Sequence, residues 1–457
     1  MKKYIGDKTF YRMVFALALP MLLQNTVSNF VNLLDNLMVG QTGTEQMSGV
    51  SIVNMILFVY NLCLFGGTSG AGIFGAQFYG KKDTDGVRYS LRFNLIVVTV
   101  FTALAIGVLS AFGTRLIGTF LHDDGTSDLA ATLAAGQGYL RIMLLGLPAF
   151  ALTNAYSGIL RGAGHPKIPM TASIVALLVN LGGNWVLIFG HLGFEAMGIR
   201  GAAVATVLSR YVEAALILLF THGGGRCEYA AGVLKNFCIP GALMKRIAVK
   251  SLPLLCNEFF WSLSQTVLTQ CYSLRGLSAV AALNINSVIT MFCGVVTMSL
   301  GNCVGVILGN ELGAGDFERA RADCPRLAAL TVTTALMTSV ALFLVAPLVP
   351  RLYNTTDAIR DMATHLAMIA AVFEPFLAYT NTAYFALRSG GRTEITVIFD
   401  SAFSWAFMVP LAWILSRKTT LPLLAIYACV CSTDVIKAVF GGVLLKKGVW
   451  IRNIVTE

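Results

Sequence analysis

Four acidic side chains lie within long apolar segments, where they could bind and release a cation. Asp35 lies near the end of the apolar run 19–43, and Glu258, Glu374 and Asp400 lie in three later runs. An ionised carboxylate inside a bilayer costs at least about 2.5 kcal/mol, so acids in such positions are functional candidates by default. Burial disfavours the ionised form of a carboxylate, and a bound cation favours it. These residues therefore predict the exchange of H⁺, Na⁺ or an organic cation.

No enzyme signature accompanies these acids. The sequence contains no H-E-x-x-H, no G-x-S-x-G and no G-x-x-x-x-G-K-[ST] phosphate loop, and its five His residues are scattered. We therefore expect neither an enzyme nor an ATP-driven pump, and no cofactor beyond the coupling ion.

The elements that position these acids are predicted to be membrane-spanning helices. The chain is 56% hydrophobic and only 12% charged, whereas a soluble domain carries about 25% charged residues. Apolar runs of about 20 residues recur along the chain without the period-two alternation of a membrane barrel, so helices must satisfy the backbone in lipid. We predict an all-α polytopic membrane protein with twelve spans. The expected spans are 13–39, 47–79, 90–114, 137–161, 168–190, 198–221, 247–273, 279–311, 327–349, 362–388, 394–416 and 421–445.

The basic residues indicate how the chain is oriented in the membrane. The net charge of +10 comes from Lys and Arg in short loops that alternate along the chain, which argues against a nucleic-acid partner. By the positive-inside rule both termini are predicted to be cytoplasmic, and that requires an even number of spans. We expect a monomer in the cell membrane, in contact with membrane lipid.

The two halves of the sequence repeat each other. Arg161-Gly162-Ala163-Gly164 aligns with Arg388-Ser389-Gly390-Gly391, and Gly67, Ala71 and Gly75 align with Gly301, Gly305 and Gly309. Spacings of four residues between small side chains let helices approach closely. We predict an N-terminal six-helix bundle (1–221), a cytoplasmic linker (222–246) and a C-terminal six-helix bundle (247–457). Six spans per half give parallel repeats, an arrangement that secondary transporters use.

The order and spacing of several motifs resemble the multidrug and toxic compound extrusion (MATE) family. The matching motifs are Leu34-Asp35 with Val39-Gly40, Leu160-Arg161-Gly162-Ala163-Gly164, and Gly309-Asn310-Glu311-Leu312-Gly313-Ala314-Gly315-Asp316. The resemblance covers nearly the whole chain. It implies a MATE/MOP-type fold of two bundles around a V-shaped cavity. It also implies export of organic cations, as drugs or metabolites, by antiport with H⁺ or Na⁺.

The resemblance suggests a coupling site in the first half. Asp35 resembles the first-helix acid of the family, which in some branches acts with an Asn, an Asp and a Thr. Here the Asn matches Asn180 and the Thr matches Thr206, while Asn184 stands at the Asp position. A neutral amide can bind or hydrogen-bond but cannot titrate. Alternatively, the two Asn residues only hold helices together, and Asp35 reaches water at the helix end.

The second half carries the other candidates. Glu258 lies about eleven residues, or roughly 16 Å, along its span, in a segment that resembles the one carrying an essential Glu in other branches. Phe259 and Trp261 beside it could line a cation cavity or pack in lipid. Glu374 lies one turn before Leu377, the position of the family's acid, and could serve the cavity or cap a helix kinked at Pro375. Asp400 is a candidate gate or structural pair, and Na⁺ could bind at Glu258 or Asp35.

Two pairs of opposite charges lie within the predicted spans. Arg210 with Glu213 and Asp434 with Lys437 are spaced i, i+3, which predicts pairing on one helix face. A lipid-linked saccharide flippase of the same superfamily is the alternative function. It would need a strongly cationic cavity, and Arg210 and Lys437 each lie beside an acid, so efflux is the preferred hypothesis.

Overall fold

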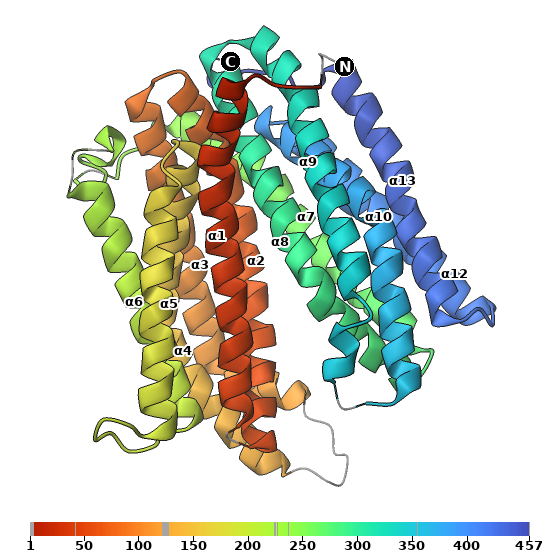
Figure 1. Ribbon diagram of the computed structural model, residues 1–457. Helices are drawn as coiled ribbons and strands as arrows, with labels where there is room; N and C mark the ends of the chain where they lie inside the picture. The colour runs from red at the N-terminus through yellow and green to blue at the C-terminus, as the bar shows by residue number, and fades with distance from the viewer. Residues whose placement is uncertain are drawn as a thin grey trace. The chain divides into compact units, whose positions relative to one another are not determined.

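The computed structural model describes residues 4–41, 43–120, 128–223, 225, 227–235, 237–353 and 355–456, and this part of the chain is almost entirely helical (Figure 1). The N-terminal half forms α1 (Lys8–Gly40), α2 (Thr44–Gly80), α3 (Thr84–Thr119), α4 (Leu129–Gly162), α5 (Lys167–Phe189) and α6 (Ile199–His222). After the short helix η1 (Glu228–Ala230), the C-terminal half forms α7 (Gly241–Ser273), α8 (Leu277–Ala314), α9 (Phe317–Val345), η2 (Val349–Leu352), α10 (Asp357–Ser389), α11 (Thr393–Val397), the π-helical turns η3 (Ile398–Ala402) and η4 (Ser404–Met408), α12 (Val409–Lys418) and α13 (Leu423–Lys447).

Eleven helical segments of the described chain are long and apolar enough to cross a membrane. One of them, Thr393–Lys418, combines α11, η3, η4 and α12. The twelfth, α7, has 33 residues and is about 50 Å long, but polar side chains such as Asn257, Glu258 and Gln265 lower its hydropathy. The predicted all-α architecture is confirmed, and most helices extend several residues beyond the predicted spans.

The chain packs into two compact units. The C-terminal unit comprises Met1–Leu22, Ala76–Lys82 and Leu252–Glu457, and the N-terminal unit comprises Leu23–Gly75 and Asp83–Ser251. Helices α1 and α2 therefore contribute residues to both units. The bundles predicted at 1–221 and 247–457, with a linker between them, were inferred from the sequence repeat. That division stays a prediction.

In the C-terminal unit, the repeated small residues let α2 and α8 approach closely. A Cβ atom on Gly80 would overlap the backbone of Asn310, and one on Gly313 would overlap the backbone of Gln77. One on Gly309 would lie 3.1 Å from the Cβ of Ala76. The small-residue spacing in the sequence thus serves helix contact, as we predicted for Gly309.

In the N-terminal unit, small residues bring α5 and α6 together. A Cβ atom on Gly183 would lie 2.9 Å from the Cβ of Ala205, and one on Gly201 would lie 2.5 Å from the carbonyl oxygen of Leu187. This close approach lets short polar side chains on the two helices, such as those of Asn180 and Thr206, reach each other.

The segment between the halves is held by one arginine. Arg92 of α3 is buried and donates hydrogen bonds to the carbonyl oxygens of Gly232 (2.8 Å), Cys238 (2.9 Å) and Val233 (3.1 Å). Charged hydrogen bonds of this kind stabilise a structure by about 1.5–3 kcal/mol each. The described part of the predicted linker is therefore anchored to the N-terminal unit.

Replacing Arg92 with Gln should loosen this segment, because an amide cannot reproduce three charged hydrogen bonds. We expect trypsin to cleave the purified protein after Lys235 at least about tenfold faster, as judged by mass spectrometry of the fragments. Arg88→Gln is the matched control on the same helix, since Arg88 pairs only with the exposed Asp85 in the described contacts. Equal cleavage rates in the two variants would show that Arg92 does not hold the segment.

Candidate functional site

Four polar residues of the N-terminal unit form a connected cluster. The side-chain amide of Asn184 donates to the carboxylate of Asp35 and, at 3.3 Å, to the side-chain oxygen of Asn180. The amide of Asn180 donates to the hydroxyl of Thr206 at 3.2 Å. Asn180 and Asn184 are one helical turn apart on α5 and are both buried. The structure brings together the four residues singled out from the sequence, and their role in coupling stays a prediction.

The cluster contains an acceptor without a donor. The Oδ1 atom of Asn184 is buried and accepts no hydrogen bond from the described residues. A buried carbonyl oxygen left unpaired is costly, so native structures usually satisfy it with a proton donor, water or an ion. An Asp at this position would carry charge, whereas Asn184 offers only a neutral oxygen beside Asp35.

Asp35 lines a cavity of about 340 Å³ in the N-terminal unit. Thr206 and Arg210 of α6 also line this cavity, together with the rings of Tyr139 and Phe150. The guanidinium of Arg210 lies 4.7 Å from the ring centroid of Phe150, within cation–π range. The cavity therefore contains an acid, a hydroxyl, a guanidinium and aromatic surface.

The predicted pair of Arg210 and Glu213 is present, but Arg210 also faces the cavity. The two side chains are 3.5 Å apart, and Glu213 accepts a second hydrogen bond from Ser173 at 2.5 Å. From the sequence, Arg210 was predicted only to neutralise Glu213. The four-residue spacing from Thr206 could have placed Arg210 on the same helix face.

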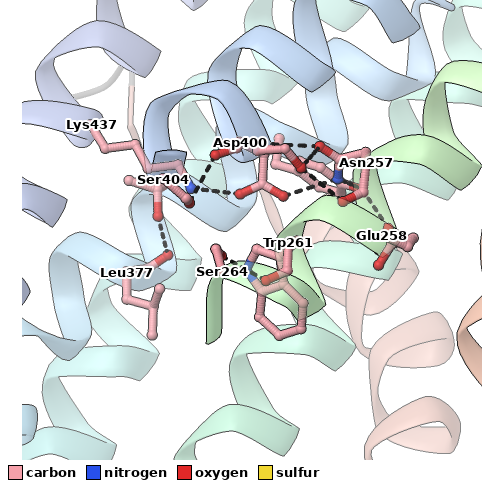
Figure 2. A network of polar contacts seen from close by, with 11 residues as sticks. Asn257, Glu258, Trp261, Ser264, Leu377, Asp400, Ser404 and Lys437 are labelled. Carbon is pink, nitrogen blue, oxygen red and sulfur yellow. Dashed lines mark hydrogen bonds and ion pairs between the residues drawn. The ribbon is translucent and has the colours of Figure 1, made fainter. Parts of the chain in front are cut away.

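A second polar network lies in the C-terminal unit, and Glu258 of α7 lies at one end of it (Figure 2). The hydroxyl of Tyr384 on α10 donates to the Glu258 carboxylate at 3.0 Å. Arg388, one turn further along α10, donates to the Tyr384 oxygen at 3.4 Å and is itself buried. From the sequence, Arg388 was noted only as part of the repeat, and the pair of Tyr384 and Arg388 was not predicted.

The neighbouring residue Asn257 connects this network to Asp400 (Figure 2). Its amide nitrogen donates to Asp400 at 3.0 Å, and its amide oxygen accepts from the Ser401 hydroxyl at 2.7 Å. Lys437 of α13 donates to Asp400 at 2.6 Å. One amide thus joins α7 to the π-helical turn η3. Where π-helical turns occur within helices, they are frequently found at functional sites.

The predicted pairing of Lys437 with Asp434 holds only as a longer-range electrostatic attraction, without a direct ion pair between these described residues. The ion pair of Lys437 is with Asp400, and both side chains are largely buried. The i, i+3 spacing places Asp434 and Lys437 on one face of α13, but the long lysine side chain reaches the carboxylate of the adjacent π-helical segment instead. Asp400 is therefore half of an ion pair between helices, and a role as a gate stays a prediction.

Glu374 lies apart from this network. It is buried on α10 and accepts a hydrogen bond from the Thr297 hydroxyl of α8 at 2.6 Å. In the described part of the chain no hydrogen bond joins it to Glu258 or Asp400. Glu374 ties α10 to α8, and Leu377, at the family's acid position, is 38% exposed.

The two predicted cavity aromatics lie near the surface of the C-terminal unit. Phe259 is 56% exposed and Trp261 is 37% exposed. Exposed rings on a spanning helix suit contact with lipid as well as with a substrate. Their role in a cation cavity stays a prediction.

Comparison with known proteins identifies the family. The MatE family model matches residues 20–186 and 253–414, which together make up more than half of the chain. The chain belongs to the MatE family. The two matched stretches correspond to the two halves of the sequence repeat, and Asp35 and Glu258 lie inside the first and the second.

Relatives of the MatE family match along nearly the full length. A probable multidrug resistance protein NorM of Thermotoga maritima is 24% identical over 439 residues, covering 96% of this chain and 93% of that protein. The structure of an outward-facing multidrug resistance MATE family transporter of the MOP superfamily has a TM-score of 0.87 at 19% identity, covering 98% of this chain and 97% of the other.

A second solved structure has the same fold, but it is described as a transporter whose function differs. It is a MOP superfamily transporter from Pyrococcus furiosus, with a TM-score of 0.85 at 20% identity and coverage of 98% of this chain and 97% of the other. Its description states that the reverse polarity of its binding pocket suggests a different function. These likenesses confirm the twelve-helix fold class, and the function has to be argued from the site.

Proposed function

We propose that this MatE protein is a secondary active efflux transporter that exports organic, cationic drugs or metabolites by antiport with H⁺ or Na⁺. The observation that carries the proposal is Asp35 on the wall of a cavity within membrane-spanning helices. The relative named a multidrug resistance protein supports it. The chain would act in the cell membrane with both termini in the cytoplasm.

The two acid networks differ in how they would hold a cation. Asp35 has amide neighbours, and the unpaired oxygen of Asn184 beside it could join the carboxylate in binding Na⁺ or accept a bond from a protonated ligand. Glu258 also accepts a hydrogen bond, from Tyr384, but the next residue in its network is Arg388, whose positive charge repels a metal ion or an organic cation. Asp35 therefore suits Na⁺ or an organic cation, whereas a proton, which needs no coordination space, suits Glu258.

Antiport follows if each carboxylate exchanges one cation for another. The ionised form of Glu258 is stabilised by the Tyr384 hydroxyl, and protonation would weaken that hydrogen bond. Because Asn257 reaches from the same turn of α7 to Asp400, a shift of α7 would also disturb the Asp400–Lys437 pair. The proposed coupling residues are Glu258, Asp35, Asn180, Asn184 and Thr206, with Glu374 and Asp400 in supporting positions.

The alternative, a lipid-linked saccharide flippase, fits this cavity less well. A pyrophosphate carries several negative charges and needs clustered cations. The cavity in the N-terminal unit contains Arg210, but Asp35 lies on the same lining and Glu213 pairs with the guanidinium. The charge balance favours efflux of small organic molecules.

The proposal is tested by efflux of a fluorescent organic cation from reconstituted vesicles. With an imposed pH or Na⁺ gradient, we expect efflux well above that of protein-free vesicles, falling to the passive leak when both gradients are collapsed. Imposing each gradient alone identifies the coupling ion. An unchanged rate after collapse of both gradients would exclude antiport.

A further inference from the structure

We propose that Arg210 selects amphoteric substrates, whose carboxylate it binds while their cationic group lies at Asp35. This inference rests on the proposed efflux function and names the substrate class of the same cavity. Its basis is the position of an arginine inside a spanning helix, on the lining that also carries Asp35.

The guanidinium is open to the cavity. The Arg210 side chain is 38% exposed, whereas that of its partner Glu213 is only 7% exposed. The carboxylate is thus buried within the unit, and of the two residues only Arg210 belongs to the cavity lining. Phe150 supports the guanidinium from one side at 4.7 Å, which fixes its position.

The ion pair leaves donors for a ligand. Its single contact of 3.5 Å joins one terminal nitrogen of Arg210 to Oε2 of Glu213, while Oε1 of Glu213 accepts from Ser173. A guanidinium has five N–H donors in a planar fork that fits a carboxylate through two bonds. The described contacts use one of the five, so a substrate carboxylate can be bound without breaking the pair.

The same cavity should bind a plain organic cation less tightly than an amphoteric molecule. Asp35 attracts a cationic group, but Arg210 repels it, and a neutral ester offers Arg210 neither a negative charge nor the two-bond geometry of a carboxylate. A molecule with one cationic and one anionic group satisfies both residues at once. The aromatic rings of Phe58, Tyr139 and Phe150 suit a flat body between the two charges.

Two dyes that differ by one methyl group test this inference. Rhodamine 110 has a free carboxylate, and rhodamine 123 is its methyl ester, with the same cationic ring system. We measure their binding to purified protein by fluorescence anisotropy, without any ion gradient. We expect the wild type to bind rhodamine 110 at least about tenfold more tightly, as one charged hydrogen-bonded contact implies.

The variant for this test removes both members of the ion pair. Arg210→Gln alone would leave Glu213 buried without its cation, so the double variant Arg210→Gln/Glu213→Gln is used. We expect it to lose the preference for rhodamine 110 and to bind rhodamine 123 as well as the wild type or better. The control is Arg115→Gln, at an exposed arginine outside the cavity lining, which should keep the preference.

Three results would overturn the inference: equal binding of the two dyes by the wild type, an unchanged preference in the double variant, or binding of neither dye. Each of these would leave the efflux proposal standing, because that proposal is tested separately by gradient-dependent transport of a cation. Loss of gradient dependence with an intact dye preference would overturn antiport alone.

Discussion

Replacing Glu258 with Gln should abolish gradient-driven transport and leave a folded protein. Gln has the same shape and can accept the hydrogen bond of Tyr384, but it cannot exchange a proton for another cation. We expect the efflux rate in vesicles to fall to that of protein-free vesicles. The cost in stability should be about 1.5–3 kcal/mol, because the Tyr384–Arg388 pair loses its charged acceptor.

Two variants make the Glu258 result specific. Asp357→Asn is an acid-to-amide change at a side chain that is 91% exposed, and it should transport like the wild type. Tyr384→Phe keeps the carboxylate and removes its donor, so it should transport more slowly without losing gradient dependence. Wild-type coupling in Glu258→Gln would move the coupling role to Asp35, and Asp35→Asn would then be expected to abolish it.

The fold and one of the two acid networks could be predicted from the sequence. The hydropathy of the runs and the membrane's demand for internal hydrogen bonding leave few alternatives to a bundle of spanning helices. The Asp35 cluster followed because Asn180 and Asn184 lie one turn apart and their partners matched family positions. Local spacing and a resemblance were sufficient, since each residue in the cluster lies at a matched position.

The network around Glu258 was harder to predict from the sequence, because its partners come from distant helices. Tyr384, Arg388 and Lys437 approach α7 or η3 through tertiary packing, and no spacing along the chain encodes those approaches. The π-helical turns add another obstacle, since they rotate Asp400 away from the position that regular helical periodicity gives. A side chain as long as lysine can also reach several acids, so its sequence neighbour is a poor guide to its partner.

Arg210 shows a second limit of prediction from the sequence. Its pairing with Glu213 was correctly predicted from spacing, but a pairing prediction does not say which member of the pair faces a cavity. Exposure of 38% for one side chain and 7% for the other is a property of packing. The inference about substrate class therefore became available only once the cavity lining was known.

Replacing Lys437 with Met should strongly destabilise the C-terminal unit. The lysine is buried and lies 2.6 Å from Asp400, whose side chain is 14% exposed. Removing one partner of a buried ion pair leaves an uncompensated charge, at a cost of about 3–5 kcal/mol. Asn257 would still donate to the Asp400 carboxylate, but a neutral donor does not replace a cation, and the Ser404 hydroxyl donates only to the backbone carbonyl oxygen of Asp400. We expect a clear fall in the melting temperature of the purified protein in detergent.

A second substitution identifies the partner. Asp400→Asn/Lys437→Met removes both charges, so it should recover most of the lost stability, since a neutral replacement of a buried pair often costs little. Asp434→Asn/Lys437→Met is the matched control, because Asp434 is the acid that helical spacing alone favours as the partner of Lys437. Recovery in the Asp434 variant but not in the Asp400 variant would contradict the observed pair. Recovery in the Asp400 variant alone would show that packing between α13 and the π-helical segment determines which acid pairs with Lys437.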